Sequence, residues 1–338
     1  MLRRPLLAAP ALLAAGPGLA QTQIQTQAGG PIAGGRPVRI VVPFPPGGAV
    51  DLLGRLLAER LGPALAQNVV VDNRGGAGGI IGADAVAKAA PDGTTLGIIG
   101  VTTFTAFPTL YARLPFDPAK DLVPLTQLTS GALLCVVNAD TAQRRGWTDF
   151  RALIAWSKAN PEGVKMGSSG TGTSSHLLIE AVNAATGARI LHVPYRGGGP
   201  AINDLLAGNI DMMFDVTPAL VPHVESGKFK ALALSSQKRM SFLPQVPGLE
   251  EFRDLGLGDV DLVSWNALGM PAGVPAPVQE RLMAAVRQVA GQADYVERLR
   301  PLGYDTVLSE SPAAMRRMIE RETPMWRAMV ERAGVKLD

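Results

Sequence analysis

The feature that most constrains this chain is a strand that runs into a glycine-rich loop and then a helix, within residues 38–61. Residues 38–44 are mostly β-branched or aromatic, as in a buried parallel strand, and two prolines and two glycines then stop the strand. Leucines recur at helical spacing from residue 52, with Asp51 in the first turn. Such a helix N-terminus exposes unpaired backbone N–H groups, so this segment predicts an anion site.

The same arrangement recurs in the second half of the chain. A short apolar segment leads into a Gly/Ser/Thr-rich loop at residues 167–175, and a helix is expected over residues 176–185. Two such loops in two halves of one chain predict a single ligand cleft between them.

Alternating strands and helices predict an α/β fold with mostly parallel sheets. Thr102 directly follows the strand expected at residues 95–101, at the edge where open α/β sheets bind ligands, although surface threonines are also common. Further elements are expected as a helix at residues 80–90, strands within residues 125–137, and helices at residues 150–159 and 218–226.

The length of 338 residues is enough for two domains. We expect the chain to cross into a second domain after residue 128 and to return after residue 235. The first domain would then comprise residues 36–128 and 236–338, and the second domain residues 129–235.

The first 20 residues are typical of an export signal. Arg3 and Arg4 precede an apolar segment, and Gly18 and Ala20 are small residues suited to cleavage after Ala20. A membrane anchor is the plain alternative, and the arginine pair also leaves the twin-arginine export route open. Residues 21–35 are expected to form a flexible lead-in.

Composition and motifs exclude several classes of protein. The net charge of +3 is spread along the chain without a basic run, which argues against nucleic-acid binding. Cys135, the single cysteine, lies in an apolar run and is expected in the core. Metal-site and phosphate-loop motifs are absent from the sequence, and the dinucleotide-binding candidate near Ala77, Gly79 and Gly82 has alanine in the place of its first glycine. Neither Ser168 nor Ser169 has an evident acid–base partner, so we expect neither a cofactor nor an enzyme.

Ordered motifs along most of the chain resemble the Bug-type periplasmic receptors of the tripartite tricarboxylate transporters. They are PFPPGG at 43–48, VDNRGGAGG at 71–79, GSSGTG at 167–172, VPYRGGGPA at 193–201 and DMMFD at 211–215. The resemblance implies a two-domain, Venus-flytrap solute receptor in the periplasm. Such a receptor closes on a small carboxylate, presents it to membrane permease subunits, and is monomeric by default.

The resemblance also implies which residues bind the ligand, mainly through backbone amides, hydroxyls and ordered water. The predicted ligand-binding residues, with Thr102, are Phe44, Gly47, Gly48, Ala49, Asp51, Ser168, Ser169, Thr171, Thr173, His176, Tyr195, Gly197 and Asp215. Three of them have alternative roles. Asp51 is expected mainly to cap its own helix, His176 to bond loop carbonyls, and Asp215 either to accept a bond from a ligand hydroxyl or ammonium or to fix the hinge.

The sequence leaves three other functions open. A receptor of the same fold could feed a signalling partner, an exported hydrolase could use Ser168 or Ser169, and a scaffold would have no ligand. Nothing in the sequence names the carboxylate, because loops of amides and hydroxyls suit many small acids.

Overall fold

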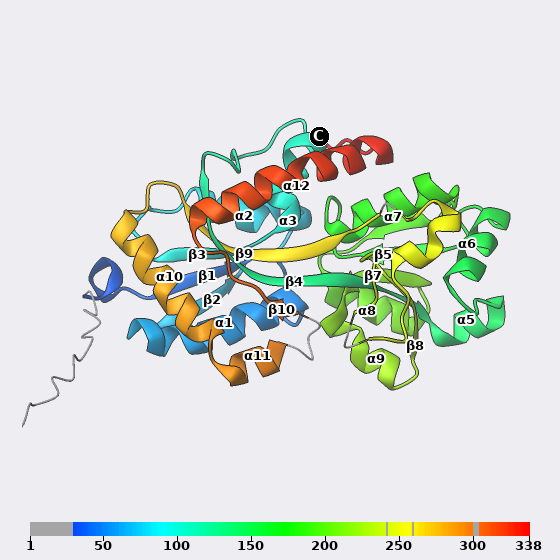
Figure 1. The fold of residues 1–338 in the computed structure, drawn as a ribbon, viewed down its shortest axis with the longest axis horizontal. Helices are drawn as coiled ribbons and strands as arrows, with labels where there is room; N and C mark the ends of the chain where they lie inside the picture. Colours follow the sequence, from blue (N-terminus) through cyan, green and yellow to red (C-terminus); the bar gives the residue numbers. More distant parts are fainter. Residues whose placement is uncertain (1–29, 241–242, 259, 300–303) are drawn as a thin grey trace, which may run out of the picture. The chain divides into compact units, whose positions relative to one another are not determined.

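The computed structural model describes residues 30–240, 243–258, 260–299 and 304–338, so the expected signal segment lies outside the described residues. Ten strands form one curled, mixed sheet in the order β2-β1-β3-β9-β4-β7-β5-β6, with β8 and β10 also paired to β4 (Figure 1). The strands are β1 (Val38–Val42), β2 (Val69–Asn73), β3 (Thr95–Gly100), β4 (Leu122–Asn138), β5 (Lys165–Ser168), β6 (Leu191–Pro194), β7 (Met212–Val216), β8 (Phe229–Leu234), β9 (Val263–Pro271) and β10 (Asp305–Thr306).

The long strand β4 divides the sheet into two halves. As far as Ala132, β4 pairs antiparallel with β9, and from Leu133 onward it pairs antiparallel with β7 and β8. The first half also contains the parallel strands β1, β2 and β3, and the second half contains the parallel strands β5, β6 and β7. Each half is therefore a partly parallel sheet closed by antiparallel pairing.

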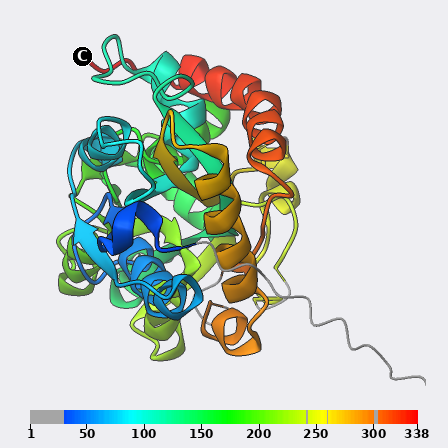
Figure 2. The same ribbon diagram turned by 90° about the vertical axis from the view of Figure 1, so that its left-hand side faces the viewer.

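Helices cover both faces of each half. The helices are α1 (Ala49–Leu65), α2 (Ile80–Ala87), α3 (Val101–Thr105), α4 (Phe107–Leu110), α5 (Ala139–Arg145), α6 (Phe150–Ala159), α7 (Ser174–Thr186), α8 (Gly198–Ala207), α9 (Val221–Glu225), α10 (Ala276–Ala290), α11 (Ala293–Leu299) and α12 (Pro312–Ala333). Figure 2 shows α10 running along the outer side of the first half. Among the described residues, none of these helices has the length and apolar character needed to span a bilayer.

Strand β1 is buried on both faces, as its apolar sequence predicts. Ile40 and Val42 pack in a core with α1 and α10, whereas Val41 packs in the core that contains α2 and α3. Helix α1 lies close to the strand because residue 54 is glycine: a β-carbon there would lie 2.6 Å from the Cγ2 atom of Val42. This packing fixes where α1 begins, directly after the glycine loop.

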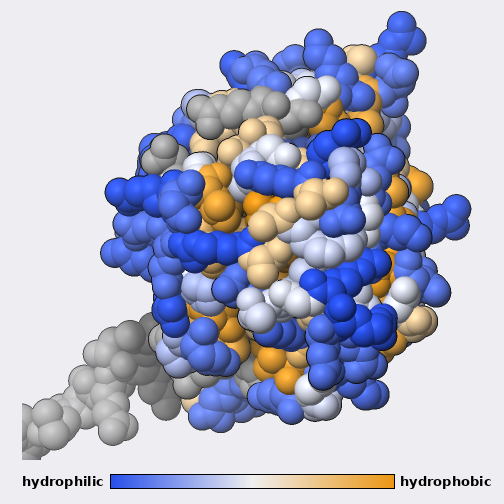
Figure 3. Space-filling model, turned by 90° about the vertical axis from the view of Figure 1, so that its right-hand side faces the viewer, coloured by the Kyte–Doolittle hydropathy of each residue, from blue (hydrophilic) through white to orange (hydrophobic). Residues whose placement is uncertain are grey.

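Helix α12 connects the two halves of the structure. It contacts α3, β4 and α7, and in Figure 1 it lies across the top of both halves. Its buried Trp326 belongs to the core cluster that joins Phe104 of the first half to Phe150 of the second half. At the end of the second half, which faces the viewer in Figure 3, hydrophobic atoms occur in small groups among hydrophilic ones.

Several expected elements differ in detail from the structure. The helix expected at residues 80–90 ends at Ala87, and the strands expected within 125–137 are one continuous strand, β4. The residues expected as a single helix at 218–226 form a short 3₁₀ turn, η3 (Thr217–Ala219), followed by α9. A new helix begins at Val221 because Pro222 has no N–H group and is tolerated only in a first turn.

Candidate functional site

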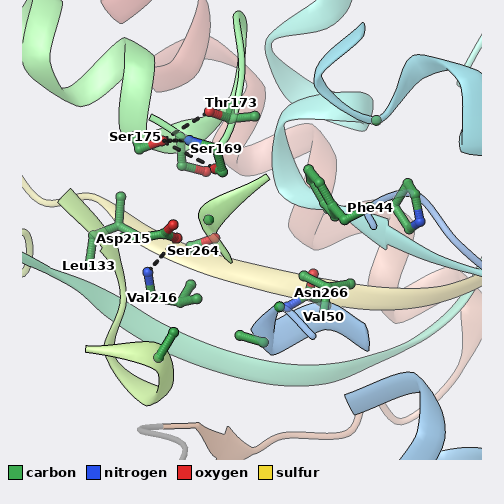
Figure 4. Close-up of a pocket in the computed structure, with 18 of the residues that line it drawn as sticks. Phe44, Val50, Leu133, Ser169, Thr173, Ser175, Asp215, Val216, Ser264 and Asn266 are labelled. Carbon is green, nitrogen blue, oxygen red and sulfur yellow. Dashed lines mark hydrogen bonds between the residues drawn. The ribbon is translucent and has the colours of Figure 1, made fainter. Parts of the chain in front are cut away.

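A cavity of about 100 Å³ lies where the glycine-rich loops of both halves meet β7 and β9 (Figure 4). The loop between β1 and α1 forms one wall, and the first turn of α7 forms another. The residues that line the cavity are Pro43, Phe44, Gly47, Gly48, Ala49, Val50, Gly78, Gly79, Gly100, Val101, Thr102, Thr103, Leu133, Ser169, Thr173, Ser174, Ser175, Gly198, Gly199, Ile202, Asp215, Val216, Ala219, Ser264, Asn266 and Tyr304.

Helix α2 begins at this cavity as a continuation of the 3₁₀ turn η2 (Ala77–Gly79), and three further helices of eight or more residues begin there: α1, α7 and α8. Their N-cap residues are Gly48, Thr173 and Gly197, and none of the three caps its helix with a side-chain hydrogen bond. The backbone N–H groups of the first turns are therefore unpaired within the helices, and the positive end of each helix dipole lies at the cavity. This arrangement attracts a carboxylate.

Asp51 holds the first loop in place from outside the cavity. Its carboxylate accepts hydrogen bonds from the Gly47 amide (2.9 Å), Arg55 (2.9 Å) and Asn73 (2.8 Å). Burial opposes ionisation of this group, but these hydrogen bonds outweigh it and lower the pKa of Asp51 below its usual value. The side chain is only 2% exposed and supports the loop and the start of α1.

Hydroxyl groups connect the second loop to the start of α7. The Ser175 hydroxyl lies 3.3 Å from the Ser169 hydroxyl and 3.0 Å from the Thr173 hydroxyl (Figure 4). Thr173 also donates a hydrogen bond to the Gly170 carbonyl at 2.7 Å. These bonds fix the loop against the helix terminus and orient several hydroxyls at the cavity wall.

Two histidines support this loop from behind. His176 accepts a hydrogen bond from the Gly172 amide at Nδ1 (3.1 Å), and Ser168 Oγ lies 2.6 Å from Nε2 of His192. The two rings stack with centroids 3.9 Å apart. Burial lowers the pKa of His176 to about 4; burial, together with the effect of His176, lowers the pKa of His192 to about 3, so both rings are neutral at pH 7.

The histidine pair and Glu180 form a possible metal-ligand set, since their ligand atoms lie within 4.8 Å of one another. The geometry does not favour a metal ion. Stacked rings aim their nitrogen lone pairs side by side, whereas a tetrahedral zinc ion needs ligand atoms that converge on one point at about 2.1 Å. The two histidines support the loop through their hydrogen bonds to Gly172 and Ser168.

The expectation that neither serine has an acid–base partner is wrong for Ser168, which lies beside His192. The sequence did not reveal that Ser168 and His192 are close, because parallel pairing of β5 with β6 brings together residues that are separated along the chain. Ser168 is nevertheless fully buried, does not line the cavity and also accepts a hydrogen bond from the Gly170 amide. A histidine with a pKa of about 3 is also a poor general base at neutral pH.

The structure brings only part of the predicted site together. Phe44, Gly47, Gly48, Ala49, Thr102, Ser169, Thr173 and Asp215 line the cavity, with Thr102 in helix α3 instead of a loop. Thr171 and Tyr195 line an adjoining pocket of about 180 Å³. Asp51, Ser168, His176 and Gly197 do not line the cavity, and His176 bonds a loop amide instead of the expected carbonyl.

Other lining residues were not predicted as site residues. Ser264 and Asn266 lie on β9 and alternate with the buried Trp265, which is the period-2 signal of a strand with one polar face. That signal was present in the sequence. Tyr304 gave no such signal, because it lies outside any regular element.

The charge of the cavity wall is unusual for an anion site. Among the described lining residues there is no lysine, arginine or histidine, and Asp215 and Tyr304 are the only titratable side chains. Burial raises the pKa of Asp215 to about 6, although a hydrogen bond from the Val216 amide opposes this. Attraction for an anion must therefore come from backbone amides and helix termini.

Known proteins share this fold. Residues 53–335 match the model of the tripartite tricarboxylate transporter family receptor. The chain belongs to this family. The sequence-based family prediction is confirmed, and so is the two-domain α/β fold of a periplasmic binding protein.

Three similar proteins illustrate the family. Protein BugT of Bordetella pertussis is 35% identical over 303 residues, which are 89% of this chain and 90% of BugT. The structure of the periplasmic binding protein BugD has a TM-score of 0.82 and 31% identity, covering 89% of this chain and 98% of BugD. The structure of Rpa4515 from R. palustris with adipate has a TM-score of 0.82 and 31% identity, covering 88% of this chain and 97% of that protein.

Proposed function

We propose that this chain is a periplasmic solute receptor that binds a small carboxylate in the cavity and delivers it to a tripartite tricarboxylate-type membrane transporter. The observation that carries the proposal is the group of unpaired helix N-termini, above all those of α1 and α7, around a cavity whose described lining residues include no cationic side chain. Family membership and the adipate-bound relative support it. The exported chain would act as a monomer and without a cofactor.

The expected interactions are strong enough for such a receptor. A charge-assisted hydrogen bond from a backbone amide contributes about 1.5–3 kcal/mol, and a partly buried helix terminus adds up to about 2 kcal/mol. Micromolar binding requires about 8 kcal/mol after the costs of closure and ordering. Two helix termini that share one carboxylate can reach this value without a lysine or an arginine.

We also propose that the two halves move as separate domains, with residues 129–235 in one and residues 36–128 and 263–338 in the other. The sequence-based boundary placed the segment between residues 235 and 263 in the first domain, whereas we assign this segment to the second domain. Within that segment, Phe252 packs on Phe150 of α6, and Asp254 forms an ion pair with Arg151 at 2.7 Å. These contacts support movement of this segment with the second domain.

A thermal-shift screen tests the receptor function. We expect at least one compound from a panel of mono-, di- and tricarboxylates, amino acids and aromatic acids to stabilise the chain from Gln21 onward. A ligand at a hundred times its dissociation constant adds about 2.7 kcal/mol of apparent stability, which raises the melting temperature by several degrees. No shift across the panel, together with no co-purified acid by mass spectrometry, would contradict the proposal.

A further inference from the structure

We propose that the bound acid carries a second group that donates a hydrogen bond, a hydroxyl or an ammonium, and that Asp215 accepts this bond. The inference rests on the proposed function, because it assumes that the carboxylate of the acid binds at the helix N-termini. It narrows the ligand from any small acid to hydroxy acids and amino acids.

The carboxylate of Asp215 is largely buried, and the described residues donate a hydrogen bond to only one of its two oxygens. One oxygen, Oδ1, accepts a hydrogen bond from the Val216 amide at 2.7 Å, and the side chain is 7% exposed. No described residue donates a hydrogen bond to the other oxygen, Oδ2. This oxygen lies against the bare α-carbon of Gly198, where a β-carbon would collide with it. The cavity wall therefore contains an acceptor oxygen with which none of the described residues pairs (Figure 4).

When a ligand fills the cavity and displaces water from this oxygen, an acceptor left without a donor is costly, and a ligand that supplies the donor avoids this cost. An ionised carboxylate at the same place would instead be repelled by Asp215, since no described lining residue carries a positive charge. The chemistry next to Asp215 thus discriminates against a second ionised carboxylate and favours a hydroxyl or an ammonium. A site built around such a bond rejects analogues that lack the donor.

Among the described residues that line the cavity, one other side chain besides Asp215 is titratable. Tyr304 is 3% exposed, its hydroxyl has no hydrogen-bond partner that meets the usual geometry among the described residues, and burial and the charge of Asp215 raise its pKa. Leu133 of β4, Gly198 of α8 and Ser264 of β9 complete the wall near Asp215 and do not titrate. Lactate and alanine do not titrate between pH 5 and 7, so a pH effect on the binding of these acids in that range can be assigned to Asp215 among the described lining residues.

The direction of that pH effect separates the proposal from its main competitor. Burial raises the pKa of Asp215 to about 6. A ligand donor favours the ionised form, so affinity should rise as the pH increases from 5 to 7. A ligand whose second carboxylate shares the proton of Asp215 would show the opposite trend, with affinity falling over the same range.

The test is isothermal titration calorimetry of the chain from Gln21 onward with acids that differ at one carbon. The matched series are succinate, malate and aspartate, and propionate, lactate and alanine. In at least one series, we expect the hydroxy acid or the amino acid to bind at least tenfold more tightly than the unsubstituted acid. The comparison is of malate or aspartate with succinate, and of lactate or alanine with propionate. The hydroxy and amino members distinguish a hydroxyl from an ammonium donor.

Two variants connect this preference to Asp215. Asp215→Asn should reduce the preference to about threefold or less. Asp211→Asn is the matched control, because Asp211 is also 7% exposed, precedes the same strand and bonds Lys165 and Arg145 outside the cavity. We expect this control to keep the preference of the unmodified chain.

Three results would overturn the inference: equal binding of the unsubstituted acid, a preference that persists in Asp215→Asn, or affinity for the preferred acid that falls from pH 5 to 7. These results would leave the receptor function intact, since a carboxylate would still bind. Failure of every acid in both series, and of the thermal-shift panel, would overturn the proposed function as well.

Discussion

We expect Gly48→Asp to weaken binding of the carboxylate ligand at least about 100-fold while leaving the protein folded. Gly48 lines the cavity as the N-cap of α1, has extended backbone angles, and has no atom within 4 Å of the position of a β-carbon. Aspartate is a favoured N-cap residue, so the helix should form at least as well. Its carboxylate would occupy the anion position and repel the ligand by several kcal/mol.

The comparison variant is Gly48→Asn, which adds nearly the same volume and caps a helix equally well without a charge. Calorimetry of both variants isolates the effect of the charge from that of the added volume. Melting temperatures report whether each variant is folded. If Gly48→Asp binds the ligand as tightly as Gly48→Asn, the carboxylate does not bind at the start of α1.

The second large effect concerns stability and pH. The pKa of His176 is about 4 in the folded protein, against 6.5 as the ordinary value. Between these values the unfolded chain binds a proton that the folded chain does not, so stability is complete above pH 6.5 and falls as the pH decreases towards 4. This shift corresponds to about 3 kcal/mol. The depressed pKa of His192 acts in the same direction.

Urea denaturation of the unmodified chain and of His176→Gln at pH 7, 5.5 and 4.5 measures this effect. The variant should lose less stability on acidification than the unmodified chain, by up to about 3 kcal/mol. Asp215 acts in the opposite direction, because its raised pKa makes the folded state bind a proton first as the pH falls below 6. Asp215→Asn should therefore steepen the acid loss. If the stability of His176→Gln depends on pH in the same way as that of the unmodified chain, His176 is not responsible for the loss of stability in acid.

The parts of the site that could be predicted from the sequence are those built by neighbouring residues. The segment that forms β1, its glycine loop and α1 carries its whole signal within residues 38–61. The loop before α7 has the same local character. The fold class followed from the same alternation of strands, glycine loops and helices.

The parts that were missed depend on pairing between distant residues. Ser264 and Asn266 reach the cavity because β9 pairs with both β3 and β4, more than 130 residues earlier in the chain. His192 meets Ser168 only through the register of β5 and β6. Burial by the folded chain also decides that His176 supports the loop from behind and that Asp215 faces the cavity. No local pattern contains this information.

The most direct test of carboxylate binding at the helix N-termini is a crystal structure of the chain with the acid identified by the thermal-shift screen. We expect the carboxylate oxygens to lie about 2.7–2.9 Å from backbone amides in the first turns of α1 and α7, at residues such as Ala49 and Ser174. No lysine or arginine side chain should contact that carboxylate. A carboxylate bound through a cationic side chain, or outside this cavity, would contradict the proposal.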